Sequence, residues 1–186
     1  MDRIQDPEVR TLAKKSSCLA AEYPELEDDQ WNKSPFNWIR CLPPRTKGAI
    51  GERLVADYLA CKGFDVTRSP DGQADRIIAG HRAEIKMSML WKNGTYKFQQ
   101  IRDQNYEFAI FLGISPFDAH CWVLPKADII DRIKTEDIPH QHGGRDGTDT
   151  AWLTINPNDV QAWLSAFGGR LECVVGLIAK ITGQKP

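Results

Sequence analysis

The sequence predicts a mixed α/β fold in which a central mixed β-sheet is flanked by helices. A clear helical segment with one broad apolar arc at residues 46–64 is followed by several short strand-like runs. One of these runs, FAIFLGI at 108–114, is apolar throughout, which is typical of a strand buried on both faces. Helical patterns return towards the C-terminus, so helices are available to cover the sheet.

Length and composition favour one globular domain of 186 residues, with 41% hydrophobic and 26% charged residues. We divide it into an N-terminal helical and irregular extension (1–45), a central core (46–126) and C-terminal helices (127–186) with a mobile loop at 140–150. The apolar runs are too short to cross a bilayer, and the polar N-terminus is unlike a signal peptide. We therefore expect a cytoplasmic protein with no membrane partner.

The N-terminal extension combines a weakly amphipathic region with an irregular one. Residues 1–30 predict a pair of helices, and three prolines in residues 31–47 break any long helix there. The second region interleaves aromatic residues (Trp31, Phe36, Trp38) with basic ones (Arg40, Arg45, Lys47). This composition suits either contact with nucleic acid or anchoring of an irregular segment onto the core.

The helix predicted at 46–64 has Thr46 as a candidate N-cap and Gly63 as its stop. Its apolar residues form one broad arc at helical spacing, and Glu52 falls at the edge of that arc. A carboxylate in this position can reach a site formed by the sheet that the helix covers.

Residues 75–86, DRIIAGHRAEIK, predict a β-hairpin that turns at Gly80 and His81. Glu84 and Lys86 are two residues apart, so their side chains point to the same side of a strand. This turn would place Asp75 opposite Lys86 and on that same side. Ile77 would share the side as well, which suggests a bulge or a twist.

The other elements are shorter. Residues 64–69 predict a first strand, and 95–108 predict a polar helix that places Gln100 and Gln104 one turn apart. The rest of the chain predicts strands at 120–126 and 151–157, and helices at 127–134, 157–167 and 171–182 with Gly168 and Gly169 before the last. The loop at 140–150 is glycine-rich and polar.

Two carboxylates and one lysine on a small patch suit attack on a phosphodiester. Acidic side chains bind a divalent cation, and an ammonium offsets the charge that builds on phosphate oxygens. The net charge of −1 does not exclude nucleic acid, because an acidic centre offsets phosphate-binding lysines and arginines elsewhere. A local basic rim is therefore the expected sign of DNA binding.

Residues 46–126 resemble the PD-(D/E)XK nuclease superfamily, which has the restriction-endonuclease-like fold. The matching pieces are Glu52, Asp75, the Glu84-Ile85-Lys86 run and the glutamine-bearing segment, in that order along the chain. Within the superfamily, KGAIGE, EIKMS and QQIRDQNYEFAIFLGISP look like small restriction-type endonucleases.

The resemblance implies that Asp75 and Glu84, helped by the Ile85 carbonyl, bind Mg²⁺, for which Mn²⁺ would substitute. Lys86 would orient or activate the attacking water. Glu52 would hold a second cation or a water on the metal, which would allow a two-metal mechanism.

Two residue assignments stay open. Gln100 would position a phosphate or the lysine, with Gln99 as the alternative. The first metal ligand is either Asp75 or Asp71, which directly follows Pro70 as the superfamily name implies. Because Pro70, Asp71 and Gly72 form a turn signature, Asp75 is preferred.

Three functions follow as hypotheses. The first is a Mg²⁺-dependent DNA endonuclease, of type II restriction type or the cleavage and nicking subunit of a heterodimeric enzyme. The second is a structure-specific repair or recombination nuclease resembling a Holliday junction resolvase, and the third is a non-catalytic DNA-binding subunit. Double-stranded DNA is the expected partner, with a homodimer or a heterodimer with a recognition subunit. The candidate DNA contacts are Arg45, Lys47, Lys92, Arg102 and Arg145.

Overall fold

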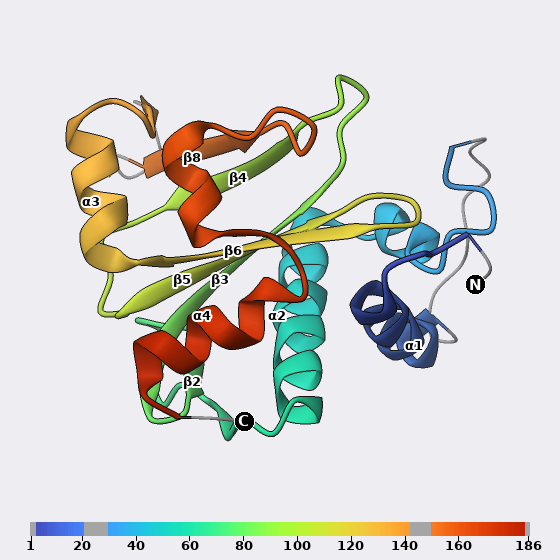
Figure 1. The fold of residues 1–186 in the computed structure, drawn as a ribbon, viewed down its shortest axis with the longest axis horizontal. Coiled ribbons are helices and arrows are strands. Elements are labelled where there is room, and N and C mark those ends of the chain that lie inside the picture. The colour runs from blue at the N-terminus through green and yellow to red at the C-terminus, as the bar shows by residue number, and fades with distance from the viewer. Residues whose placement is uncertain (1–2, 21–29, 142–149, 185–186) are drawn as a thin grey trace.

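Within the described residues, a six-stranded mixed β-sheet forms the centre of the protein (Figure 1). The structure is a computed structural model that describes residues 3–20, 30–141 and 150–184. Strands β3 and β5 are parallel, and their other neighbours in the sheet are antiparallel. The order is β1 (Val66–Arg68), β2 (Arg76–Ile78), β3 (His81–Met89), β5 (Phe108–Ile114), β6 (Ala119–Pro125) and β9 (Gly168–Arg170). The predicted mixed α/β fold is confirmed.

Helices cover one face of this sheet. Helix α2 (Pro44–Cys61) packs along β3, α4 (Cys173–Thr182) packs on β6 and β9, and α1 (Pro7–Ala20) packs against α2. The apolar arc of α2 is buried as predicted, with Leu54 and Leu59 fully enclosed. None of the helices in the described part of the chain is long and apolar enough to span a membrane.

A second sheet covers the opposite face. Within the described residues it has three strands, in the order β4 (Tyr96–Ile101), β8 (Thr150–Ile155) and β7 (His140–Gln141). Helix α3 (Lys126–Lys134) and the 3-10 helix η2 (Ala162–Phe167) complete this side. The layers meet through aromatic rings, for example Phe98 edge-on to Phe111 with 5.3 Å between ring centroids.

Strand β5 lies between the two cores, which explains its apolar sequence. Ile110 and Leu112 belong to the core under the helices, whereas Ala109 and Phe111 belong to the core under the second sheet. Every residue of β5 is buried. The prediction of a central strand buried on both faces is therefore confirmed.

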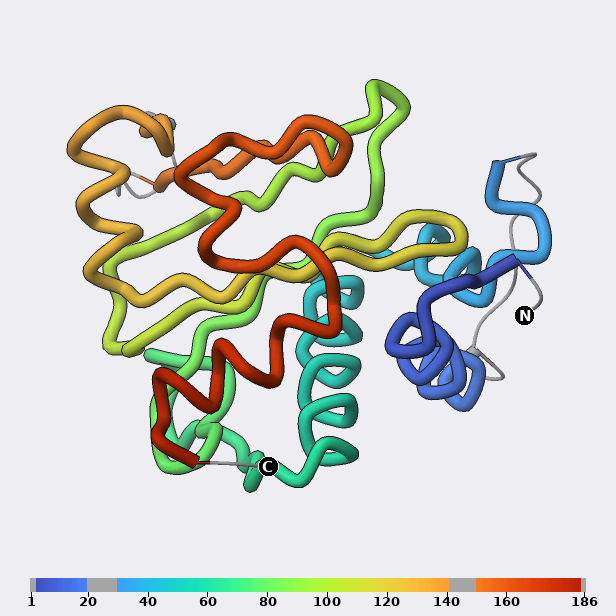
Figure 2. Tube along the Cα trace, in the orientation of Figure 1, coloured from blue at the N-terminus to red at the C-terminus, as the bar shows by residue number. Residues whose placement is uncertain are grey.

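The aromatic residues of the N-terminal extension anchor it to the core. Trp31, Phe36 and Trp38 are all buried, and the Trp38 indole donates to the Ser16 hydroxyl of α1 at 2.9 Å. The tip of the β5–β6 hairpin reaches this end of the molecule (Figure 2). Anchoring therefore accounts for these aromatics, and they are not exposed for stacking on nucleic acid.

The polar helix predicted at 95–108 is wrong, because this segment contains β4. Tyr96, Phe98 and Ile101 are buried, whereas Lys97 and Gln99 face outward. This alternation is the period of a strand, but the polar residues between the buried ones obscured it in the sequence. Gln104 lies after the strand, where its amide donates to the Gly72 carbonyl at 3.3 Å.

Several other boundaries also differ from the predictions. The hairpin turns at Ala79 and Gly80, because Ile78 pairs with His81. Helix α2 begins at Pro44 and not at a Thr46 cap, since proline fits the first position of a helix. The second helix of residues 1–30 would lie largely at 21–29, outside the described residues.

The C-terminal third contains more strand than predicted. Residues 157–167 form turns and η2 in place of a regular helix, and Gly168 and Gly169 belong to strand β9. At Gly168, φ is +136° and a Cβ would lie 2.3 Å from the Cys121 carbonyl oxygen. The glycine therefore permits close pairing with β6, which is why it does not mark a helix boundary.

The contact between α2 and β3 at Gly51 predicts a steric effect on stability. A Cβ on Gly51 would lie 2.5 Å from the Cβ of Met87, so Gly51→Ala should lower the free energy of unfolding by about 1–3 kcal/mol. Gly48 of the same helix has open space around it, so Gly48→Ala should raise this free energy by about 0.5–1 kcal/mol. Urea unfolding checks both, and equal effects of the two substitutions would contradict the packing argument.

Candidate active site

A groove of about 840 Å³ opens between the first half of α2, strand β3 and strand β4. Six basic and two acidic side chains line it, although the whole chain carries a net charge of −1. The groove is therefore the local basic region that nucleic-acid binding requires. The charged lining residues are Arg40, Arg45, Lys47, Glu52, Asp75, Lys86, Lys92 and Lys97.

Strand β3 brings Glu84 and Lys86 together beside the groove. The Lys86 ammonium lies 2.6 Å from a Glu84 carboxylate oxygen. Their parallel neighbours on β5 are Ala109 and Phe111, which face the second sheet. The side chain of Glu84 is only 10% exposed and that of Lys86 is 21% exposed. The pair is thus held in a largely buried position where water screens it weakly.

Asp75 reaches the same place from just before β2. Its carboxylate accepts a hydrogen bond from the Ile85 N–H at 2.7 Å, and its own N–H donates to the Ala83 carbonyl at 3.0 Å. In the sheet Ala83 is paired with Arg76, so the hydrogen bond from Asp75 to Ala83 departs from regular pairing. This irregularity agrees with the bulge or twist that the position of Ile77 suggested. Beyond the Arg76–Ala83 pair, the next residues are Asp75 and Glu84, so Asp75 lies two residues along β3 from its predicted partner Lys86.

The carboxylates influence one another. Burial raises the pKa of the Glu84 carboxyl, and the neighbouring Asp75 carboxylate adds to this, while Lys86 opposes it. Burial likewise raises the pKa of Glu52, with contributions from Asp75 and Glu84 and opposition from Arg76. Acidic groups whose pKa values are raised by burial and by nearby carboxylates, as for Glu84 and Glu52, are a common feature of sites that bind a cation or move a proton.

Glu52 lines the groove, but its carboxylate has a protein partner. An Arg76 guanidinium nitrogen lies 3.2 Å from a Glu52 oxygen and donates to the Asp75 carbonyl at 2.7 Å. Among the described residues, no group of three or more histidine, cysteine or acidic side chains could hold a metal ion. The structure therefore places Asp75 and Glu84 next to each other, and Glu52 lies near them in an ion pair with Arg76.

The start of α2 adds positive charge to the groove. Its first turn contains Arg45 and Lys47 but no acidic residue, although a helix N-terminus favours negative charge. Burial and the nearby Arg40 lower the pKa of the Lys47 ammonium. An anion bound here would relieve both unfavourable interactions.

Both candidate glutamines line the groove, although they lie on a strand. From Phe98 to Ile101 the β4 strand advances three residues while its partner β8 advances two, so a bulge lies at Gln99 and Gln100. Gln100 has φ = 57°, in the left-handed region. A bulge interrupts the alternation of the strand, and this lets two successive side chains face the groove.

Asp71 lies in the turn that its sequence predicts. Its carboxylate accepts the Gln73 N–H at 2.9 Å and pairs with the Arg82 guanidinium, and these contacts lower its pKa. Asp71 does not line the groove. The structure thus brings Asp75, and not Asp71, to Glu84.

The predicted DNA contacts differ in their relation to the groove. Arg45, Lys47 and Lys92 line the groove. Arg102 is exposed just beyond the end of β4 and does not line it, and Arg145 lies outside the described residues.

Sequence reasoning missed several side chains of the site. Arg76 holds Glu52, and the Ser88 hydroxyl accepts the Lys97 N–H at 2.9 Å, which fixes β4 against β3. Trp91 and Lys97 form part of the groove wall. Only Trp91 carried a signal, because a lone tryptophan beside a lysine in a turn is a candidate for exposure.

Comparison with known proteins adds little beyond the fold. No protein-family model matches the chain, and no curated protein matches it. Among solved structures, it is similar to a bacterial homing endonuclease, I-Ssp6803I, with 14% identity and a TM-score of 0.47. The similarity covers 74% of this chain and 96% of that chain. At this TM-score the two folds are only loosely alike.

The Arg76–Glu52 pair predicts an electrostatic effect on stability. Arg76→Met should lower the free energy of unfolding by about 2 kcal/mol, because Glu52 and the Asp75 carbonyl both lose a charged donor. Adding Glu52→Gln should recover part of this loss, which chemical denaturation of the single and double variants would measure. Arg170 is 67% exposed and pairs with Glu172, so Arg170→Met should cost no more than about 0.5 kcal/mol. Equal losses of unfolding free energy in Arg76→Met and Arg170→Met would contradict a stabilising role of the Arg76–Glu52 pair.

Proposed function

We propose that this protein is a Mg²⁺-dependent endonuclease that hydrolyses phosphodiester bonds in double-stranded DNA. The observation that carries the proposal is the juxtaposition of Asp75, Glu84 and Lys86 beside a groove rich in basic side chains. Two carboxylates and an ammonium meet the needs of the reaction, and the surrounding cations match the charge of the substrate.

The donor set suits Mg²⁺. This ion is usually held by one or two carboxylates and completes its coordination with water and substrate phosphate oxygens. Asp75 and Glu84 would supply the carboxylates, and the Ile85 carbonyl is a third candidate oxygen. Bound there, the cation would act as a Lewis acid on the scissile phosphate. Mn²⁺, which prefers the same oxygen ligands, should substitute.

The chain's own residues would do the rest. Lys86, held by Glu84, would place its ammonium at the phosphate to orient the attacking water and offset developing negative charge. Arg45 and Lys47 would hold phosphates along the groove, and Gln100 or Gln99 would position the strand to be cut. The low exposure of the Glu84–Lys86 pair strengthens the electrostatic interactions that Lys86 makes.

The resemblance to PD-(D/E)XK enzymes favours a restriction-type endonuclease or the nicking subunit of one. Cutting both strands needs two such sites, so a homodimer or a heterodimer with a recognition subunit is part of the proposal. A branch-specific nuclease uses the same chemistry, and cleavage of linear and branched DNA side by side separates these two forms. A non-catalytic subunit would show salt-dependent DNA binding without cleavage.

Cleavage of plasmid DNA tests the proposal directly. Wild-type protein with Mg²⁺ should nick or cut the plasmid, and Lys86→Ala should lower the rate by about 100-fold or more because the transition-state charge loses its ammonium. Lys180→Ala on α4 is the matched control, since Lys180 is exposed and does not line the groove. Equal, negligible cutting by wild type and Lys86→Ala on varied DNA would contradict the proposed enzymatic activity.

Metal binding can be measured without cleavage. Mg²⁺ should raise the melting temperature of the wild-type protein, and a concentration 100 times the Kd would add about 2.7 kcal/mol of stability. Asp75→Asn and Glu84→Gln should abolish this rise, because each removes one of the two carboxylates. Asp71→Asn should keep it, as Asp71 is bound in its own turn. A rise that survives in both site variants would place the metal elsewhere.

A further inference from the structure

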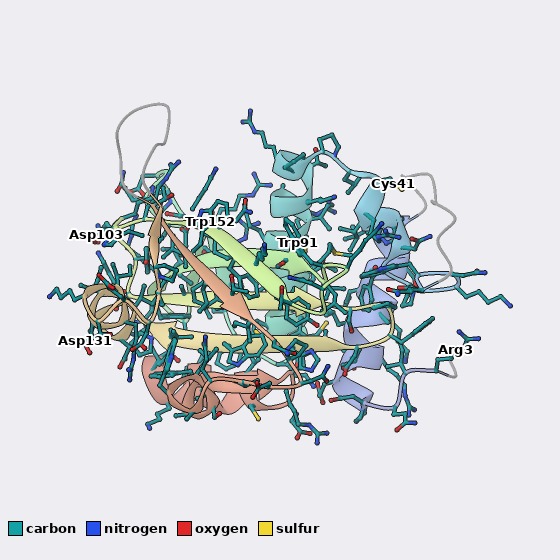
Figure 3. All side chains as sticks on the ribbon, turned by 90° about the horizontal axis from the view of Figure 1, so that it is seen from above. Arg3, Cys41, Trp91, Asp103, Asp131 and Trp152 are labelled. Carbon is teal, nitrogen blue, oxygen red and sulfur yellow. The ribbon has the colours of Figure 1, made fainter. Side chains whose placement is uncertain are left out.

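Trp91 is the one large hydrophobic side chain that is exposed in the described part of the chain, at 48% of its surface. It lies at the rim of the groove, on the connection between β3 and β4 that rises above the sheets in Figure 1. Figure 3, seen from above, labels Trp91 on this side of the molecule. A single exposed hydrophobic side chain is common on protein surfaces, so the case for a binding role rests on what surrounds this indole.

Backbone hydrogen bonds close the turn that carries Trp91, and a cation–π contact orients its indole ring. The backbone N–H of Trp91 donates to the Thr95 carbonyl, and the backbone N–H of Gly94 donates to the Trp91 carbonyl, both at 2.9 Å. The Asn93 side chain accepts from the Thr95 hydroxyl at 2.8 Å, which closes the turn further. The Lys97 ammonium lies 4.4 Å from the centre of the indole ring, a cation–π contact that favours this orientation of the ring. A partner would therefore meet a ring that is already in place, at a low entropy cost.

The charges around Trp91 indicate what kind of partner this is. Lys92 and Lys97 both line the groove beside it, and no described carboxylate forms a salt bridge with either. A flat aromatic ring next to ammonium groups is the usual means of holding a nucleotide, whose base stacks on the ring while its phosphate meets the cation. Within a continuous duplex the base faces are covered by their neighbours, so such a ring can stack only on a base that has left the stack.

We propose that Trp91 stacks on an unstacked base of the bound DNA, and that Lys97 and Lys92 contact the phosphates beside that base. The inference rests on the proposed function and deepens it, because it names a substrate feature. Trp91 would be a positioning residue that holds a displaced nucleotide at the groove containing Lys86. DNA with an unpaired nucleotide would bind more tightly than a perfect duplex, because its base leaves the stack at lower cost.

Fluorescence anisotropy in EDTA tests this without cleavage. Two labelled duplexes are compared, one perfect and one with a single extra unpaired thymine. Trp91→Ala should weaken binding of the second duplex by about tenfold or more, the range found for loss of one base–aromatic stack. It should change binding of the perfect duplex by less than about threefold, and Trp91→Phe should restore most of the lost affinity because a phenyl ring still stacks.

The outcomes separate this inference from the proposed function. Failure of the wild-type protein to bind either duplex would overturn both. Binding and Mg²⁺-dependent cleavage by wild type, with unchanged affinity in Trp91→Ala, would overturn the stacking inference alone. An equal loss on both duplexes, a loss that Trp91→Phe does not restore, or a changed oligomeric state with unchanged DNA affinity would overturn it as well.

Discussion

The hydrogen bond from the Ile85 N–H to the Asp75 carboxylate is the interaction on which the candidate site depends. It holds Asp75 against β3, next to the buried Glu84, although two carboxylates at close range repel each other. The ion pairs of Lys86 with Glu84 and of Arg76 with the neighbouring Glu52 offset this repulsion. Charge concentrated in this way lowers stability, and proteins commonly accept that cost where a site needs a cation or a charged substrate.

Close packing between layers turns this cluster into a groove. Gly51 lets α2 approach Met87 of β3, which brings Glu52 and the basic start of the helix to the carboxylates. On the other side, the Ser88 hydroxyl holds the Lys97 backbone and thus the beginning of β4. Each wall comes from a different part of the chain, and the core on both sides of β5 fixes the distance between them.

The glutamine segment illustrates how a residue can reach the site from an unexpected element. Polar composition favoured a helix, but burial of Tyr96 and Phe98 at every second position makes it a strand. Gln99 and Gln100 both reach the groove because the bulge breaks the strand's alternation. Both glutamines line the groove, while their backbone conformation was decided by packing against the central sheet.

The sequence by itself determined which side chains of the hairpin share a side. A turn displaced by one residue moves the pairing by two, and a period of two keeps Glu84 and Lys86 on one side of β3 in either register. It also determined the buried strand β5 and the apolar face of α2, because local periodicity reports burial. Only the tertiary structure decided that Asp75 adjoins Glu84, that Arg76 pairs with Glu52, and that Trp91 stays exposed at the groove. These features depend on contacts between distant segments, which no local pattern encodes.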